Sequence, residues 1–186
     1  MARAETRERI LDTAERLFFA DGIGVTGVDR VAAEAGVAIA TLYQHVGSKD
    51  GLLAAVLDRR LAAWTTQWEA SIEAATSPRA RLLALFDALA EFRRTSGTTQ
   101  WCAFLATASE RPSGDPDDPV ELLVLADTSV LATRLRALAR EAEVADVDAV
   151  VDQLLVVYNG ALASLLRGSP ADPVARARTI AEAIVP

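Results

Sequence analysis

Hydrogen-bonding side chains are concentrated in a short stretch near the amino end of the sequence. Tyr43, Gln44 and His45 follow one another, and Lys49, the only lysine in the chain, comes four residues later. A tyrosine hydroxyl can donate to a phosphate oxygen beyond its apolar ring, and a histidine can do so even when neutral. A glutamine can form two hydrogen bonds with adenine. These residue types suit contact with a nucleic acid, whereas no nucleophile and base stand together in the sequence.

Each of these side chains also has a purely structural interpretation. Tyr43 suits an amphipathic filler of the core, and His45 suits a solvated surface position. Lys49 suits ordinary surface scatter, but it falls in the first turn of an expected helix, where a positive charge opposes the helix dipole. That local misfit favours a functional reason, namely a phosphate contact.

The element that would position these side chains spans residues 28–46, VDRVAAEAGVAIATLYQHV. The pattern predicts two short helices, residues 28–35 and 39–45, joined by a tight turn. Ala32 is small enough for close crossing of the helices, Gly36 can adopt the positive φ of the turn, and Leu42 can face the core. This spacing predicts a helix-turn-helix, although an ordinary helical hairpin would also satisfy it.

Helical periodicity dominates the whole chain, and no sustained alternation of period two occurs. In the first expected helix, Ile10, Ala14, Leu17 and Phe18 form one apolar stripe. Caps or prolines mark several later starts. We therefore predict an all-α fold with nine helices, over residues 7–20, 28–35, 39–45, 49–75, 78–95, 100–110, 119–143, 147–168 and 173–185.

Composition and charge exclude several classes of protein. Hydrophobic residues make up 51% and charged residues 24% of the 186 residues, which is typical of a globular chain. The net charge is −7, and residues 1–50 hold six basic and eight acidic side chains. Bulk charge thus argues against nucleic-acid binding, so any DNA interface must depend on where a few positive groups lie.

Other features bound the chemistry and the compartment. One cysteine and one histidine cannot form an intramolecular disulfide or a Cys/His zinc site, and we expect no metal and no cofactor. No apolar run approaches the roughly 20 residues that span a bilayer. The amino end lacks the apolar segment of a signal peptide. We therefore expect a soluble, cytoplasmic protein with no membrane partner.

Residues 41–53, TLYQHVGSKDGLL, resemble the TetR family of transcriptional regulators, also called TetR/AcrR. In that family a Thr-Leu-Tyr-x-His-(Phe/Val) recognition helix precedes a Ser-Lys pair and a Leu-Leu. Residues 8–37, ERILDTAERLFFADGIGVTGVDRVAAEAGV, are similar to the family's beginning. The resemblance is specific over residues 6–57. It is weaker beyond, where residues 101–119 are similar to a Cys-x-Phe-Leu…Glu…Asp-Pro stretch of some members.

The resemblance implies a fold of nine or ten helices in two domains. An N-terminal three-helix domain, residues 1–57, would carry the helix-turn-helix at about residues 28–46. A C-terminal helical domain, residues 58–186, would bind a ligand and form a dimer. Small residues on one side of the last two helices, at 160–164 and 177–184, suit close helix packing, either between protomers or within one chain.

The resemblance also implies contacts with the DNA backbone. Tyr43 and His45 match positions that touch phosphates or base edges. Thr26 matches a phosphate contact at the start of the second helix, although it equally suits a helix cap. Lys49 would hold a phosphate, and backbone N–H groups at helix starts would add uncharged donors.

Base recognition follows less directly. Gln44 and Thr41 can contact base edges. Ile39 and Ala40 occupy family positions that are often polar or small, and they could meet only a thymine methyl. Ile39 also stands three residues before Leu42 and so suits the core. The expected DNA-binding residues are Thr26, Ile39, Ala40, Thr41, Tyr43, Gln44, His45 and Lys49.

The C-terminal two thirds contain isolated polar groups among apolar helices, which suits a mostly apolar ligand cavity. Each aromatic taken singly also suits plain core packing. Cys102 suits a small buried hydrophobe better than a reactive thiol. The residues expected to line a pocket are Trp64, Trp68, Phe86, Trp101, Phe104, Asp127, Tyr158 and Asn159.

Together these features predict a dimeric transcriptional regulator, most often a repressor in this family, that binds double-stranded DNA at a palindromic operator and is released by a small-molecule effector. Two alternatives remain. A small helical enzyme would need catalytic groups that His45 and Cys102, far apart in sequence, do not supply. A helical interaction module without DNA activity would suit the acidic net charge.

Overall fold

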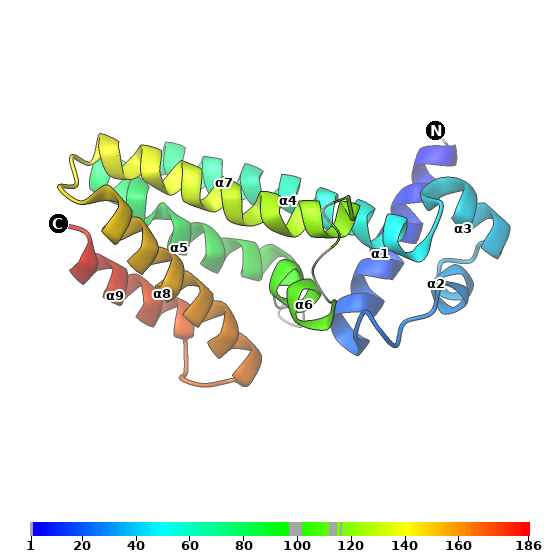
Figure 1. The fold of residues 1–186 in the computed structure, drawn as a ribbon. Coiled ribbons are helices and arrows are strands. Elements are labelled where there is room, and N and C mark those ends of the chain that lie inside the picture. The colour runs from blue at the N-terminus through cyan, green and yellow to red at the C-terminus, as the bar shows by residue number, and fades with distance from the viewer. Residues whose placement is uncertain (1, 97–101, 112–114, 116) are drawn as a thin grey trace. The chain divides into compact units, whose positions relative to one another are not determined.

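The structure, a computed structural model, describes residues 2–96, 102–111, 115 and 117–186. These described residues form helices without strands, which confirms the all-α prediction (Figure 1). The helices are α1 Ala2–Asp21, α2 Val28–Glu34, α3 Ile39–Val46, α4 Lys49–Ala74, α5 Pro78–Ser96, α6 Ala103–Glu110, α7 Pro119–Glu141, α8 Val147–Arg167 and α9 Pro173–Ile184.

Most helix boundaries agree with the predicted ranges within a few residues. The exception is α1, which begins at Ala2 rather than near residue 7. The first residues are charged or small and carry no apolar stripe, so periodicity placed the start too late although they favour a helix. The predicted start of the sixth helix at residue 100 lies outside the described residues.

Side-chain caps account for many of the helix starts. Ser48, Ser77, Asp118, Asp146 and Asp172 each accept a hydrogen bond from a backbone N–H two or three residues later, at 2.8 to 3.3 Å. Each bond satisfies one of the donors that a helix start leaves without an intrahelical partner. Each of these caps stands directly before a helix start that the sequence predicts, at residues 49, 78, 119, 147 and 173.

The chain divides into two compact units, and the division falls within α4 and α7. The first unit comprises Met1–Ala62 with Cys102–Ala126, and the second comprises Ala63–Trp101 with Asp127–Pro186. The first unit therefore includes α6 and the start of α7, which lie outside the predicted N-terminal domain of residues 1–57.

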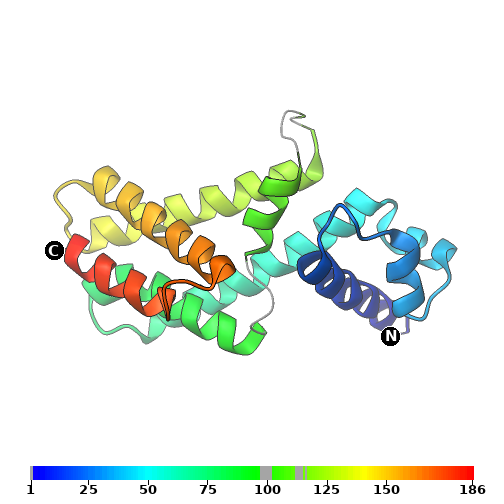
Figure 2. The same ribbon diagram turned by 90° about the horizontal axis from the view of Figure 1, so that it is seen from below.

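The first unit is built on the predicted stripe of α1. Ile10, Ala14, Leu17 and Phe18 are all at most 1% exposed, and α1 contacts α2, which in turn contacts α3. Figure 2 shows these three helices grouped together, in blue and light blue. Burial of each large side chain in this stripe stabilises the fold by about 1.5 to 3 kcal/mol.

The second unit packs α5, α8 and α9 with the remaining parts of α4 and α7. Direct contacts join α8 to α9 and α5 to α9. Arg79 at the start of α5 donates to the backbone carbonyls of Glu182 at 2.7 Å and Pro186 at 3.0 Å, which anchors the end of the chain. Leu82, Phe86 and the two tryptophans of α4 lie in the core.

Helix α8 departs from the expectation that no apolar run is long enough to span a bilayer. Among the described residues it is the one helix that qualifies by length and composition, with a mean hydropathy of 1.6 over a window that is 28% buried. One such helix is weak evidence for a membrane segment, because core helices pass the same test. The sequence estimate was wrong because Asp148, Asp152 and Asn159 interrupt the run without lowering its mean much.

Candidate nucleic-acid interface

The helix-turn-helix has the geometry that the sequence predicts. Ala32 of α2 is 1% exposed and Leu42 of α3 is 0% exposed, so both face the core. Gly36 has φ +66° in the turn, a conformation that L side chains rarely adopt. The backbone N–H of Val37 donates to the carbonyl of Ala32 at 3.0 Å and closes the turn.

The outer face of α3 carries the side chains that the sequence singled out. Tyr43 is 42% exposed and Ile39 is 47% exposed, so neither fills the core, and the core interpretation of both is wrong. The reason is helical geometry: Leu42 fills the inward position, and positions one turn apart at 39 and 43 share the outward face. Ala40 and Gln44 are exposed, and Thr41 and His45 are partly exposed.

An open groove of about 550 Å³ lies between α3 and the start of α1. Its lining brings Thr41, Gln44 and His45 together with Arg3 and Thr6. Sequence reasoning missed Arg3 and Thr6 because they stand far from the motif. The signal that could have found them is helical spacing, since residues three apart lie on one face of a helix.

Lys49 begins α4 and lies over the loop between α1 and α2. Its Nζ donates to the carbonyl of Gly24 at 3.2 Å. The N–H of the same Gly24 donates to the carboxylate of Glu110 at 3.0 Å. The loop is therefore held from both sides, and within the described part of the chain Lys49 makes no ion pair, which leaves its charge uncompensated.

Thr26 is an interior residue rather than a cap. It is 0% exposed, and its hydroxyl donates to the carbonyl of Gly22 at 2.7 Å. The N-cap of α2 is Gly27, with no side-chain hydrogen bond, so the cap interpretation is wrong. The Thr26 hydroxyl donates to a carbonyl of its own loop instead of capping α2. Comparison of the motif alone does not show which of these partners the hydroxyl has.

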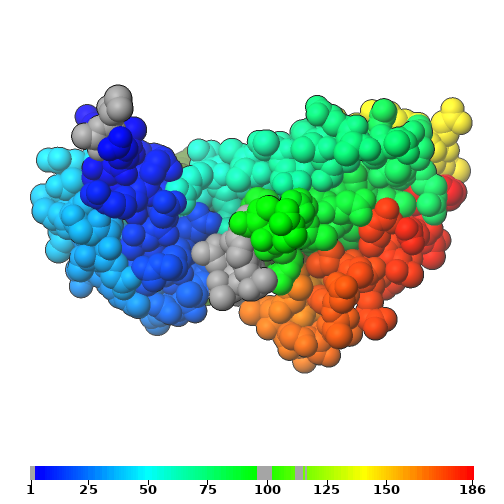
Figure 3. Space-filling model, turned by 180° about the vertical axis from the view of Figure 1, so that it is seen from behind, coloured from blue at the N-terminus to red at the C-terminus, as the bar shows by residue number. Residues whose placement is uncertain are grey.

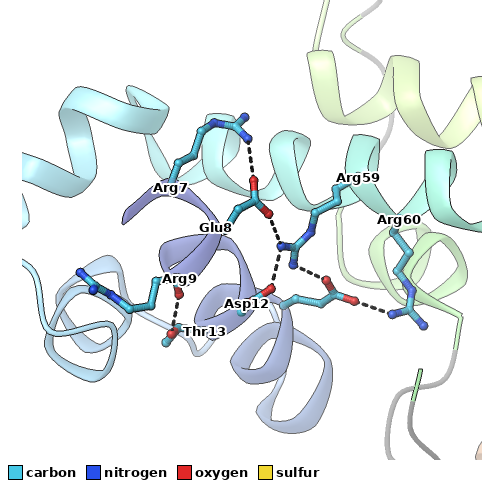
Figure 4. A network of polar contacts seen from close by, with 8 residues as sticks. Arg7, Glu8, Arg9, Asp12, Thr13, Arg59 and Arg60 are labelled. Atoms are coloured by element: carbon cyan, nitrogen blue, oxygen red, sulfur yellow. Dashed lines mark hydrogen bonds and ion pairs between the residues drawn. The ribbon is translucent and has the colours of Figure 1, made fainter. Parts of the chain in front are cut away.

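A network of arginines neutralises the acidic face of α1 (Figure 4). Arg59 of α4 contacts Glu8 at 3.0 Å, Asp12 at 2.7 Å and Glu15 at 2.7 Å, and Arg60 contacts Glu15 at 2.5 Å. Burial lowers the pKa of Arg59, but its hydrogen bonds with these carboxylates outweigh burial and raise the pKa overall. These contacts also fasten α1 to α4.

The other acidic residues near the interface are compensated in the same way. Glu34 contacts Arg16 and Arg30, and hydrogen bonds from both arginines lower its pKa. Arg30 also contacts Asp21 at 2.8 Å. Asp50 pairs with Arg111, a hydrogen bond that raises the pKa of Arg111. Six of the eight acidic side chains in residues 1–50 thus have an arginine partner: Glu8, Asp12, Glu15, Asp21, Glu34 and Asp50.

The residues expected to line a ligand pocket lie in different surroundings. Trp64 stacks with Trp68 at a centroid distance of 6.1 Å and lies 6.0 Å from Tyr158. Phe92, which the sequence analysis missed, meets Trp64 edge-on at 5.6 Å. The structure therefore brings three of the expected residues together in one aromatic cluster.

The other expected residues differ from one another in burial and in the unit to which they belong. Phe86 is fully buried in the second unit, and Phe104 is 7% exposed within the first unit. Asn159 is exposed on α8, and Trp101 lies outside the described residues. Asp127 is partly buried, and burial raises its pKa to about 6.

The tight turn at Gly36 between α2 and α3, with Ala32 and Leu42 buried and polar side chains on the outer face of α3, places this protein in the class of helix-turn-helix DNA-binding proteins. Residues 10–56 match the family described as bacterial regulatory proteins, tetR family. The solved structure of SCO4454, a TetR-family transcriptional regulator from Streptomyces coelicolor, is 31% identical with a TM-score of 0.88, over 98% of this chain and 95% of that chain. The chain belongs to the TetR family of transcriptional regulators.

Other relatives are more distant or match only in part. FasR of Mycolicibacterium smegmatis, named a transcriptional activator, is 34% identical over 92 residues, or 50% of this chain and 42% of FasR. A regulator of Staphylococcus aureus, SAB2452, is 35% identical over 65 residues, or 35% of each protein. The chain thus spans less than half the length of these curated relatives. A regulator from Saccharomonospora viridis, crystallised with choline, shares the fold at 22% identity and a TM-score of 0.82, over 98% of this chain and 96% of that chain.

Proposed function

We propose that this protein is a dimeric repressor that binds a palindromic operator and is released by a small-molecule effector. The observation that carries the proposal is the outer face of α3, where Tyr43, Gln44 and His45 project above the buried Leu42. A recognition helix enters the major groove in this way, with its inner side held by the core. Six of the eight carboxylates in residues 1–50 are paired with arginines, which reduces their local repulsion of phosphates although the net charge stays −7.

The proposed DNA contacts are of two kinds, those with phosphates and those with bases. Tyr43, His45, Lys49 and Arg3 would donate to phosphate oxygens, which would position the protein without specifying sequence. Gln44 and Thr41 would contact base edges, and Ile39 and Ala40 would meet thymine methyl groups. Thr26 would support the interface by holding the loop under Lys49 rather than by touching DNA.

The dimer would form through the exposed face of α8 together with α9. Val156 is 72% exposed and Ile180 is 52% exposed, while Gly160 is also exposed. Ala161, Ala177 and Ala181 are buried within the protomer, so only part of the small-residue surface is free for a partner. Figure 3 shows α8 and α9, in orange and red, side by side on the surface of the second unit. A dimer would present two recognition helices to half-sites about 34–36 Å apart, or a multiple of that.

Effector control would arise in the second unit, around Trp68, which packs against the aromatic pair of Trp64 and Tyr158. The Saccharomonospora viridis regulator, which shares the fold, is solved in complex with choline, and this supports ligand binding by the fold. An effector releases DNA only if it binds the released state more tightly than the DNA-bound state. The protein would act in the cytoplasm, without catalysis.

The test is fluorescence anisotropy with labelled DNA from the region upstream of the protein's own gene, at a low salt concentration of about 50 mM. Tyr43→Ala combined with Lys49→Ala is expected to lower affinity at least about a hundredfold, because two hydrogen bonds to charged phosphates are lost. Lys49→Ala alone should also reduce the slope of log affinity against log salt by about 1.

The matched control is Arg94→Ala, which removes one positive charge from an exposed site in the second unit. It should leave operator affinity unchanged. An enzyme or an interaction module would be indifferent to the double substitution, and absence of salt-sensitive binding to any upstream fragment would refute the proposal. A reporter gene then separates repression from the activation for which FasR is named.

A further inference from the structure

An open groove of about 450 Å³ runs between α4 and α7 in the second unit. On the α4 side it is lined by Thr65, Trp68 and Glu69, and on the α7 side by Ser129, Val130, Thr133, Arg134 and Ala137. The lining combines one almost fully buried tryptophan with hydroxyl groups and a single ion pair. This mixture is typical of a site for a small molecule with an apolar body and a few polar atoms.

Two of the groove's residues hold hydrogen-bond donors that have no partner. Three buried side-chain nitrogens in the described residues lack an acceptor: Trp64 Nε1, Trp68 Nε1 and Arg134 Nε. Trp68 is 1% exposed, so water does not reach its ring freely. A buried donor without an acceptor is unfavourable by about 1 to 3 kcal/mol, and native proteins keep few such groups without a reason.

The two unpaired nitrogens of the groove residues, Trp68 Nε1 and Arg134 Nε, are both hydrogen-bond donors. The partner that they lack is therefore an acceptor. Arg134 also forms an ion pair with Glu69, with 2.5 Å between Nη2 and Oε2. The net charge of this pair is zero. A carboxylate placed here would face Glu69, and an ammonium group would face Arg134. An uncharged acceptor avoids both repulsions.

We propose that this groove binds a small, uncharged, largely apolar molecule through a carbonyl oxygen, which accepts hydrogen bonds from Trp68 Nε1 and Arg134 Nε once the two side chains turn toward the groove. The apolar body lies along Val130 and Ala137. The inference deepens the proposed effector control and rests on it, since it names the chemical class of the effector. The same contact would satisfy two donors that the free protein leaves unpaired.

Trp64 provides an internal comparison. It stands one helical turn before Trp68 and also has an unpaired N–H, but it does not line the groove. Its ring is enclosed by Phe92 and Tyr158. A substitution at Trp64 therefore perturbs the aromatic cluster without removing a groove donor.

The experiment is calorimetric titration of the full chain with three probes: methyl octanoate, octanoate and octylamine. We expect saturable binding of methyl octanoate, weaker binding of octanoate and none of octylamine. Trp68→Phe keeps an aromatic ring but deletes the donor, and it should weaken binding of methyl octanoate about tenfold. Trp64→Phe, the matched control, should change this affinity less than about twofold. Circular dichroism confirms that both variants fold.

Ala137→Phe fills the groove from its rim and should abolish binding while leaving the core intact. Equal losses from Trp64→Phe and Trp68→Phe, tighter binding of octanoate than of the ester, or similar uptake of all three probes would each overturn the inference. Operator binding measured without any probe separates the two proposals. Intact DNA binding with no ester binding refutes only the groove, whereas absent DNA binding refutes the regulator.

Discussion

Asp127 shows how one residue's surroundings set its chemistry. It stands where the second unit resumes on α7, partly buried, and burial raises its pKa from 3.8 to about 6. Within the described part of the chain it has no recorded ion pair or hydrogen bond. Transfer of a carboxylate from water without compensation is unfavourable, so burial shifts the equilibrium of Asp127 toward its protonated form.

Asp127 therefore makes the stability of the protein depend on pH. The folded state holds this proton more tightly than the unfolded chain. The stabilisation is fully present below about pH 4 and is lost as pH rises through about 6. We expect Asp127→Asn to raise the free energy of unfolding by about 1 to 2 kcal/mol at about pH 8, with a smaller gain at about pH 5. Urea unfolding at both pH values measures this, and an equal gain at both would contradict it.

At the scale of elements, the junction of α3 and α4 fixes how the recognition helix is presented. Gly51 lies in the first turn of α4, where a Cβ atom would stand 2.1 Å from the carbonyl oxygen of Val46. Only glycine allows this approach. Ser48 caps the same turn through the N–H of Gly51 at 2.9 Å. The last turn of α3 is therefore held directly against the first turn of α4.

Gly51→Ala should force these two turns apart. We expect the free energy of unfolding to fall by about 2 kcal/mol or more, and operator affinity to fall because α3 is displaced. Gly160→Ala is the matched control. It lies in a helix with nothing within 4 Å of the added Cβ, so it should be neutral or stabilising by up to about 1 kcal/mol. Denaturant unfolding compares the two, and a neutral Gly51→Ala would show that the junction is not tight.

At the scale of the whole molecule, we expect DNA binding to depend more on where the charged side chains lie than on the net charge. The chain carries −7, yet six of the eight carboxylates in residues 1–50 are paired with arginines, while Lys49 and Arg3 have no ion-pair partner among the described residues. The other molecular feature is α8, whose exposed apolar side is unusual for a monomer in water. A second copy of the chain would cover it.

Dimer formation is therefore expected to depend on α8. Val156→Glu would place a charge on its exposed face and should convert dimers to monomers. Operator affinity should then fall about a hundredfold or more, because the second half-site is no longer engaged within one complex. Leu122→Glu is the matched control, since Leu122 is 51% exposed on α7 in the first unit. Analytical ultracentrifugation gives the masses, and an unchanged dimer for Val156→Glu would exclude this face.

Much of the local structure could be predicted from the sequence. The positions of Ala32, Gly36 and Leu42 predicted the helix-turn-helix, and aspartates and serines predicted most helix starts. These signals are local, because a cap, a positive φ or an apolar stripe depends on residues within a few turns. The outward direction of Tyr43 followed from the same periodicity once Leu42 was placed inside.

The tertiary structure alone decided what depends on distant partners. It buried Thr26, grouped α6 with the first unit, and brought Arg3 to the groove of α3. It also paired acidic residues of α1 with Arg59, more than forty residues away. Burial and electrostatic compensation arise only when remote segments meet, so neither periodicity nor a charge count could supply them.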